Sequence, residues 1–485
     1  MATVVILGAG IAGHTAARYL DKWVGGRHDI VVVSPNAKWN WIPSNIWVGV
    51  GQMREDDVTF DLATIYARTR VDFRQARALA IHPEGDAHGT RGYVAIEYTA
   101  GERSGQYDKV EFDFLINATG PKLNFGATPG LGPEHGHTVS VCTAGHAVEA
   151  NEQLQQVIAA LRAGETRTLV IGTGHGTCTC QGAAFEYIFN VDHVLREAGV
   201  RERARVVWLS NEYELGDFGM GGVHITRGGY VTNGKTFVES LMVERGIEWI
   251  TRAHVHRVEP GVIHYELLDG STGELAFDFS MLIPPFSGVG LKAFDRTGDD
   301  ITAKVFAPNG FMRVDADYTP RPFAQWSAND WPKTYQSPLY PALFAVGIAF
   351  APPHPISKPM QSPSGTAINP TPPRTGMPSA AMAKAVAASV RDMLEGAERP
   401  THEASMARMG AACVASTGSH LFKGTAATMT VYPVVPDYAK YPEYGRDMKL
   451  TFGEIGLAGH WMKSLLHHTF IYQARLRPGW SLLPA

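Results

Sequence analysis

Apolar and polar positions near the start of the chain predict a strand, a helix and a second strand. The apolar run Val4–Leu7 is followed by a helical pattern over Ala12–Trp23 and then by a second apolar run, Asp29–Val33. Short apolar runs bounded by turn residues are typical of buried strands, and strands that alternate with helices are typical of parallel sheets. We therefore expect a β–α–β unit here.

The same order of elements returns in the middle of the chain. The apolar run Thr168–Ile171 precedes a helix that we expect from about Gln181 to Glu197, and a strand is expected over Ala204–Ser210. Two such units predict an α/β fold with two doubly wound, Rossmann-like domains.

The segments around these units predict how the domains share the chain. Alternating patterns over residues 71–94 and 95–114 predict strands and a hairpin, and Ala342–Gly347 predicts another buried strand. Residues 351–378 are rich in Pro and Ser and predict a loop, after which a helix is expected over Ser379–Leu394. We expect a discontinuous first domain at residues 1–150 and 300–398. A second domain, residues 151–299, is inserted within it, and a C-terminal region follows at residues 399–485.

Composition narrows the class of protein. The 485 residues are 45% hydrophobic and 19% charged, which is typical of a folded chain with more than one domain. The net charge of −4 gives no reason to expect a nucleic-acid partner. No apolar stretch of about 18 residues occurs, so we expect no spanning helix, and we expect no secretory leader. Four cysteines in so long a chain do not predict a disulfide framework, and we predict no metal site.

A glycine-rich loop follows the first strand. Gly8, Gly10 and Gly13 form the G-x-G-x-x-G spacing between an apolar strand and a helix, which is the context that a dinucleotide pyrophosphate needs. The acid that often ends the second strand is replaced by Ser34. We expect Ser34 and Lys38 to hold the adenosine end, which favours a flavin dinucleotide over a nicotinamide one.

The second glycine-rich loop carries cysteines. Gly172, Gly174 and Gly176 follow the middle strand, and Cys178 and Cys180 stand where a nicotinamide pyrophosphate would lie. The positive end of a helix dipole favours a thiolate. We therefore expect sulfur chemistry at this loop; an ordinary nucleotide loop that happens to carry cysteines is the alternative.

Three of the four cysteines stand in recognisable frames. Cys142 lies in Val-Cys-Thr-Ala-Gly-His-Ala, Cys180 in Cys-Gln-Gly-Ala-Ala-Phe-Glu, and Cys413 in Ala-Ala-Cys-Val-Ala-Ser. Each cysteine alone is best interpreted as a small buried apolar residue. Together with a flavin-type loop, they indicate that electrons move through sulfur into a flavin.

The C-terminal region ends in an amphipathic segment. One helical face is formed by Ile455, Ala458, Trp461, Met462, Leu465, Leu466 and Thr469, whereas Lys463, His467 and His468 lie off it. Such a helix can lie in a membrane interface, with its basic groups toward lipid headgroups. A helix packed on the core is the alternative.

The chain resembles the sulfide:quinone oxidoreductases, membrane-associated flavoproteins with a glutathione-reductase-like fold, over essentially its whole length. The resemblance rests on the Gly8 loop, the three cysteine frames with His146, Trp41-Ile42-Pro43-Ser44, Ile283-Pro284-Pro285-Phe286, and Arg374-Thr375-Gly376. Two departures are Asp217, where many members have His, and the additional Cys178.

The resemblance implies a mechanism and a set of site residues. Cys180 and Cys413 would form a disulfide or longer sulfur bridge that hydrosulfide attacks, and a thiolate would pass two electrons to FAD through its C4a atom. Cys142 would lie at the flavin edge, and Glu186 and His146 are candidates for proton handling. The residues expected to bind FAD are Gly8, Gly10, Gly13, Ser34, Lys38, Pro43, Ala78, Thr119, Gly120, Gly347 and Arg374.

The resemblance also implies partners. Sulfide would be oxidised to polysulfide, and a quinone would be reduced. The protein would associate peripherally, as a monotopic protein, with the cell membrane, and a homo-oligomer is one state that this family resemblance allows. Two alternatives stay open. One is the flavin subunit of a flavocytochrome sulfide dehydrogenase, and the other is a type-two NADH:quinone oxidoreductase, which has no use for these cysteines.

Overall fold

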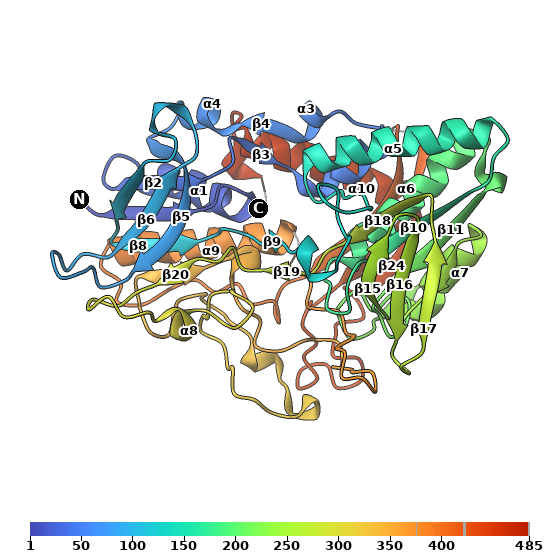
Figure 1. Cartoon of the computed structure of the whole chain (residues 1–485). Coiled ribbons are helices and arrows are strands. Elements are labelled where there is room, and N and C mark those ends of the chain that lie inside the picture. Colours follow the sequence, from blue (N-terminus) through green and yellow to red (C-terminus); the bar gives the residue numbers. More distant parts are fainter. Residues whose placement is uncertain (375, 421–422, 484–485) are drawn as a thin grey trace.

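The structure is a computed structural model, and it describes residues 1–374, 376–420 and 423–483. Two sheets with parallel strands lie in two halves of the molecule (Figure 1). The helices and strands follow the predicted order, so the α/β fold class with two doubly wound domains is confirmed.

The first half is built on an eight-stranded sheet. Its parallel part has the order β21-β8-β1-β2-β5, and β6 and β7 extend it as an antiparallel meander, while β20 also pairs with β5. The helices α1 and α9 pack against each other beside it. The bounds are β1 Thr3–Leu7, α1 Ile11–Val24, β2 Asp29–Ser34, β5 Val71–His82, β6 Tyr93–Tyr98, β7 Tyr107–Glu111, β8 Phe114–Asn117, β20 Lys292–Ala293, β21 Leu343–Ala345 and α9 Gly376–Leu394.

The second half is built on a four-stranded parallel sheet with the order β14-β11-β10-β18. A three-stranded antiparallel sheet, β15-β16-β17, follows in the chain. The bounds are α5 Ala144–Arg162, β10 Arg167–Thr173, α6 Gln181–Glu197, β11 Ala204–Leu209, α7 Gly234–Glu244, β14 Glu248–Ile250, β15 Ala253–Glu259, β16 Val262–Leu267, β17 Thr272–Ala276 and β18 Phe279–Ile283.

A third sheet joins the C-terminal region to the second half. Its order is β13-β12-β24-β23-β22, and β22 packs on α6 while the last long helix, α10, packs on β22 and β23. The bounds are β12 His224–Arg227, β13 Tyr230–Asn233, β22 Ala411–His420, β23 Lys423–Val431, β24 Phe452–Gly456 and α10 Leu457–Ala474.

Short elements complete the fold. The strand pairs β3 with β4 and β9 with β19, and four helices of four or five residues, connect the larger elements. Their bounds are β3 Lys38–Asn40, α2 Asn45–Val48, α3 Glu55–Val58, β4 Thr59–Asp61, α4 Leu62–Tyr66, β9 Lys122–Leu123, β19 Phe286–Ser287 and α8 Thr302–Val305. We propose the same domain division for the molecule as the sequence suggested, with residues 1–150 and 300–398 forming the first domain.

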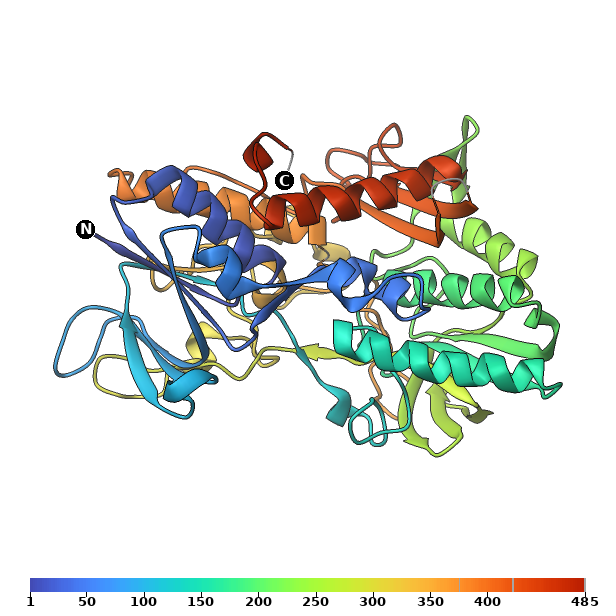
Figure 2. The same cartoon turned by 90° about the horizontal axis from the view of Figure 1, so that it is seen from above.

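The helix α10 faces the protein with its polar side. His460, Lys463, His467 and Gln473 are buried, whereas Leu465 on the other side is 66% exposed. Figure 2 shows this helix, in red, along the outside of the molecule, with α1 in blue near one end. The expectation that Lys463 faces lipid headgroups is therefore wrong, because its ammonium group pairs with Glu186 inside the protein.

Candidate functional site

The first glycine-rich loop forms an open cradle at the carboxyl end of β1. Gly8 has φ +91°, and a Cβ on it would lie 2.4 Å from the carbonyl oxygen of Ala118. A Cβ on Gly13 would lie 1.9 Å from the carbonyl oxygen of Gly8, whereas one on Gly10 would meet no described atom within 4 Å. No side chain in the described part of the protein caps the first turn of α1. Free N–H groups at this turn and open space beside Gly10 fit a pyrophosphate.

Three strands end at this edge of the first sheet. Thr119 follows β8, and its Oγ1 donates to Asn117 Oδ1 at 2.8 Å; Gly120 beside it has φ +71°. Gly347 follows β21, and a Cβ on it would lie 3.1 Å from Ala12 Cβ on α1. Segments far apart in sequence therefore line one cradle.

The other predicted cofactor residues have mixed surroundings. Ser34 is buried at the end of β2, where its Oγ accepts from the Asn36 N–H at 3.4 Å. Lys38 is exposed and lies 3.0 Å from Glu55, so the structure ties its ammonium group to a carboxylate of the chain. Ala78 is half-buried beside an irregularity in the pairing of β5 with β6.

Arg374 connects the cradle to the cysteines. It is buried, and its Nη1 donates to the carbonyl oxygens of Ile348 at 2.9 Å and Phe350 at 2.6 Å. Its Nε has no hydrogen-bond partner among the described residues. Burial lowers the pKa of this guanidinium to about 10, and Cys180 is close enough to oppose that effect. A buried donor without a partner fits a polar cofactor atom; Thr375, next in this motif, lies outside the described residues.

Cys142, Cys178 and Cys180 lie close together before α5 and α6, and all four cysteines are free thiols in the structure. Cys180 is the residue before α6 and has φ +65°, a left-handed backbone that a non-glycine residue adopts only under constraint. Burial raises the pKa of the Cys180 thiol, and Arg374 opposes this rise. Burial also raises the pKa of Cys142 to about 12.

Cys413 joins them from the third sheet. It lies on β22, and a Cβ on Gly182 would come within 2.9 Å of its sulfur atom. Gly182 belongs to the first turn of α6, directly after Cys180 and Gln181. The fold therefore brings Cys413 over the same helix turn that begins at Cys180. Burial, followed by the charge of Glu186, raises the pKa of the Cys413 thiol to about 12.

Glu186 forms a buried ion pair that the sequence did not reveal. Its Oε2 accepts from Lys463 Nζ at 2.9 Å, its Oε1 accepts from the Ser416 N–H at 3.3 Å, and Lys463 also donates to the Pro43 carbonyl at 3.0 Å. The sequence feature that could have indicated this contact is the position of Lys463 and His467 off the apolar face of the last helix. His467 also turns inward, and its Nδ1 lies 2.9 Å from Ser44 Oγ.

His146 lies on the first turn of α5. Its N–H donates to Thr143 Oγ1 at 3.1 Å, and its Nδ1 has no partner among the described residues. Burial lowers its pKa, and its ring lies edge-on to Phe125 at 6.0 Å. Its role stays a prediction.

Comparisons with known proteins show which class of enzyme the chain resembles. Residues 2–205 match the family model described as pyridine nucleotide-disulphide oxidoreductase. The chain is 29% identical, over 472 residues, to the sulfide-quinone reductase of Aquifex aeolicus (strain VF5). The alignment covers 97% of this chain and 91% of that protein. The protein is an oxidoreductase, and its residues 2–205 resemble the pyridine nucleotide-disulphide oxidoreductases. This class implies a flavin cofactor, and the open cradle at Gly10 fits one.

Solved structures agree with this assignment. The oxidoreductase superposes on the sulfide:quinone oxidoreductase from the hyperthermophilic bacterium Aquifex aeolicus with a TM-score of 0.75 and 27% identity, over 98% of this chain and 92% of that one. It also resembles NDH2 from Plasmodium falciparum, with a TM-score of 0.62 and 11% identity over 99% and 95% of the two chains. The second likeness shows the fold alone.

The second glycine-rich loop of this oxidoreductase is covered by its own chain. A Cβ on Gly176 would lie 2.2 Å from the carbonyl oxygen of Ala367, and the Asn369 N–H donates to the Gly176 carbonyl at 2.8 Å. The Thr371 N–H donates to the Cys178 carbonyl at 3.0 Å. Residues 367–373 thus lie against the second glycine-rich loop and cover it.

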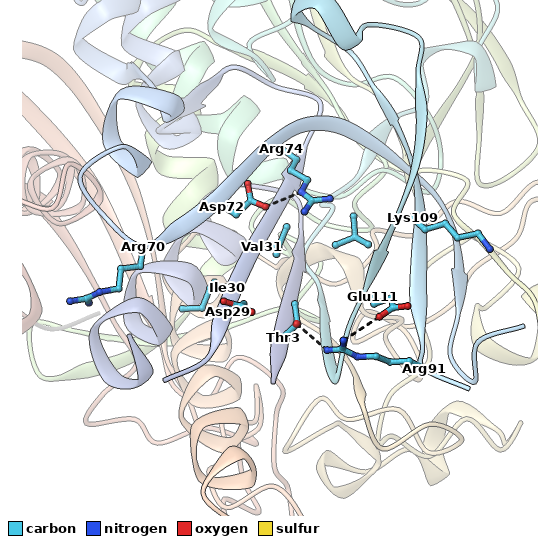
Figure 3. A pocket seen from close by; sticks show the side chains of 11 residues that line it. Thr3, Asp29, Ile30, Val31, Arg70, Asp72, Arg74, Arg91, Lys109 and Glu111 are labelled. Carbon is cyan, nitrogen blue, oxygen red and sulfur yellow. Dashed lines mark hydrogen bonds and ion pairs between the residues drawn. The ribbon is translucent and has the colours of Figure 1, made fainter. Parts of the chain in front are cut away.

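A surface cavity of about 410 Å³ lies elsewhere on this oxidoreductase (Figure 3). It is lined by Thr3 and Asp29, at the amino ends of β1 and β2, so it lies at the opposite edge of the first sheet from the cradle. Two of its arginines pair with two of its acids: Arg74 lies 2.9 Å from Asp72, and Arg91 lies 3.2 Å from Glu111. This cavity is separate from the cysteines and from Arg374.

Proposed function

We propose that the protein oxidises sulfide at a cysteine pair and passes the electrons through FAD to a quinone. The likeness to sulfide-quinone reductase over 97% of the chain supports this function. The observation that carries it is the position of the Cys413 sulfur against Gly182, two residues after Cys180 on the first turn of α6, with Arg374 close to Cys180.

The chemistry at the cysteines follows from thiol–disulfide exchange. Cys180 and Cys413 would be joined by a disulfide in the oxidised enzyme, and hydrosulfide would attack one of the two sulfur atoms. The bond between the cysteines breaks, a persulfide forms on one cysteine, and the electron pair of the broken bond leaves the other as a thiolate. FAD, when bound, would accept the two electrons that leave the sulfur site. The sulfur chain that grows on the cysteines would leave as polysulfide.

The surrounding residues would hold the cofactor and handle protons. The cradle at Gly8, Gly10 and Gly13 would bind the FAD pyrophosphate, and Arg374 would face the ring with its unpartnered Nε. Cys142 would lie at the ring edge. The Glu186–Lys463 pair connects Cys413 to the helix α10 and is the candidate for proton supply on the quinone side.

The helix α10 is the proposed membrane contact. No helix in the described part of the chain is long and apolar enough to cross a bilayer. Several exposed side chains of α10 and its neighbours are apolar, namely Ile42, Ile455, Trp461, Met462 and Leu465. A helix that keeps its polar side on the protein and its apolar side outward fits the surface of a bilayer, where a long-chain quinone resides.

Anaerobic titration of the purified protein tests the function. Sulfide should bleach the flavin absorbance, whereas NADH should not, because residues 367–373 cover the second loop. Rapid bleaching by NADH with sulfide inert would instead identify a type-two NADH:quinone oxidoreductase.

A further inference from the structure

A second buried carboxyl group lies beside the sulfur site. Glu212 comes three residues after the end of β11 and is fully buried. Its Oε2 accepts from Ser210 Oγ at 2.7 Å, and its Oε1 accepts from the Phe218 N–H at 2.8 Å. Among the described residues no ion pair reaches it, in contrast to Glu186 with Lys463. Burial of a carboxylate with only neutral partners is costly and favours the protonated form.

The helix α6 brings Glu212 to the cysteines. Gln181 Nε2 donates to Asn211 Oδ1 at 3.0 Å, so the residue before Glu212 is tied to the residue after Cys180. One turn later, the Phe185 ring lies 5.3 Å from the Phe218 ring. Gly182 lies between Gln181 and Phe185 in the sequence, and the Cys413 sulfur lies against Gly182. The same part of α6 therefore contacts both the Glu212 loop and Cys413.

Cys413 therefore lies near two carboxyl groups of different kinds. The charges of Glu186 and of Glu212 both raise the pKa of its thiol, after burial, while Lys463 opposes them. Of these two carboxyl groups, Glu186 pairs with a cation, and Glu212 has no such pair among the described residues. A negative charge on Glu212 would therefore raise the pKa of the Cys413 thiol, with no paired cation to reduce the effect.

The other charged groups that face Glu212 strengthen this conclusion. Asp217, on the same loop, is buried and accepts from the Gly219 N–H at 2.9 Å and from Ser357 Oγ. Arg446 lies behind Asp217 but donates to the carbonyls of Met220 and Gly222, at 2.8 and 3.1 Å. Burial, followed by the charge of Asp217, raises the pKa of Glu212 to about 7.

We propose that Glu212 is the proton-holding group of the sulfur site, neutral whenever hydrosulfide or a cysteine thiolate stands beside Cys413. This inference rests on the proposed function. Hydrosulfide brings one negative charge, breaks the Cys180–Cys413 bond, forms a persulfide on Cys180 and leaves the electron pair on the Cys413 sulfur. One negative charge is thus present before and after the step, and the Glu212 proton stays in place. An ionised Glu212 would add a second charge in a dry site, where like charges repel strongly.

The substitution Glu212→Gln mimics the protonated form and keeps the acceptor for the Phe218 N–H. We expect the rate of flavin reduction by sulfide, measured by stopped flow, to be equal in the variant and the wild type at about pH 6. Above neutrality the wild type loses its protonated fraction, so the ratio of variant to wild-type rate should rise about tenfold by about pH 8. Glu214→Gln, a change at a half-buried residue on the same loop, should leave the wild-type profile unchanged. A flat ratio across this range would overturn the proposal.

A second readout does not depend on the flavin. In reduced protein, the rate at which iodoacetamide alkylates Cys413, followed by mass spectrometry, gives the pKa of that thiol. Glu212→Gln should lower this pKa, and an unchanged value would also overturn the proposal. If Glu212→Gln does not fold, Asp217→Asn serves instead. It removes a charge that raises the pKa of Glu212, so the rate of this variant should begin to decline at a lower pH than the wild-type rate. If sulfide fails to reduce the wild type at any pH, the proposed function fails, while alkylation still decides the role of Glu212.

Discussion

Gly182 has no side chain, and the Cys413 sulfur lies against the space that a Cβ would take. Alanine is normally the better helix former by about 1 kcal/mol, so Gly182→Ala should not weaken α6 itself. A Cβ at 2.9 Å from the sulfur would force Cys413 away from Cys180. We expect the variant to fold, to retain flavin and to be reduced by sulfide at least about tenfold more slowly in stopped-flow measurements, since a 1 Å misplacement can cost about a hundredfold in rate.

The matched control is Gly145→Ala on the first turn of α5. A Cβ there would meet no described atom within 4 Å, so this variant should keep the wild-type rate. If sulfide reduces the flavin of Gly182→Ala at the wild-type rate, the contact between Cys413 and α6 is not needed for this step.

The cysteines themselves give a second prediction at this scale. Cys180→Ser and Cys413→Ser should each abolish reduction of the flavin by sulfide, because a sulfur bridge needs both atoms, while flavin absorbance is retained. Cys178→Ser should be milder, because Cys178 donates its S–H to the Ile283 carbonyl at 3.0 Å inside the protein. Full activity in either of the first two variants would remove that residue from the mechanism.

Single residues also show the limits of sequence reasoning. The glycine loop and the cysteine frames are local patterns, so the sequence predicted them. Lys463 meets Glu186 across 277 positions of the chain, and Glu212 approaches Cys413 only because α6 contacts both the Glu212 loop and the strand β22 that carries Cys413. Contacts of this kind depend on tertiary packing, which no local spacing reveals.

Among the elements, α10 combines a buried polar side with an exposed apolar side. Transferring one leucine side chain from water to an apolar medium contributes about 1.5–3 kcal/mol, whereas a carboxylate at the same place opposes transfer. We expect Leu465→Glu to lower the fraction of protein that floats with liposomes by about tenfold or more. Reduction of the flavin by sulfide should not change, because Leu465 is 66% exposed and points away from the cysteines' side of the helix.

The control for this prediction is Val243→Glu, at an apolar residue that is 67% exposed on α7. It adds the same charge to the surface and should leave flotation unchanged. Equal flotation of both variants and the wild type would make α10 an ordinary surface helix. Deleting residues 454–485 is a poorer experiment, because it also removes Lys463 and leaves Glu186 buried without its cation.

Element boundaries were predicted well where turns are marked and less well elsewhere. The structure places α6 at Gln181–Glu197, as the sequence indicated, because Cys180 and the glycines before it end the loop. The helix α9 begins at Gly376, three residues before the predicted Ser379. The reason is Pro378: proline fits the first turn of a helix, where its missing N–H is not needed.

At the scale of the molecule, flavin binding should hold distant segments together. The cradle combines residues after β1, β8 and β21 with Arg374. A ligand at about 1,000 times its Kd stabilises the folded form by about 4 kcal/mol. Flavin-free protein, made under riboflavin limitation, should therefore melt about 5–15 °C lower in calorimetry. Added FAD should restore the melting temperature; equal values with and without flavin would show that this cradle is not the binding site.

The discontinuous first sheet has a consequence for synthesis. The strand β21 and Arg374 belong to the cradle but leave the ribosome more than two hundred residues after β8. At about 5–20 residues per second, that delay is roughly 10–50 s. During this time the nascent chain carries Gly8, Gly10 and Gly13 without the partners that complete their pocket. Nascent chains arrested before Leu343 should therefore retain no flavin, whereas chains released after Leu394 should begin to do so.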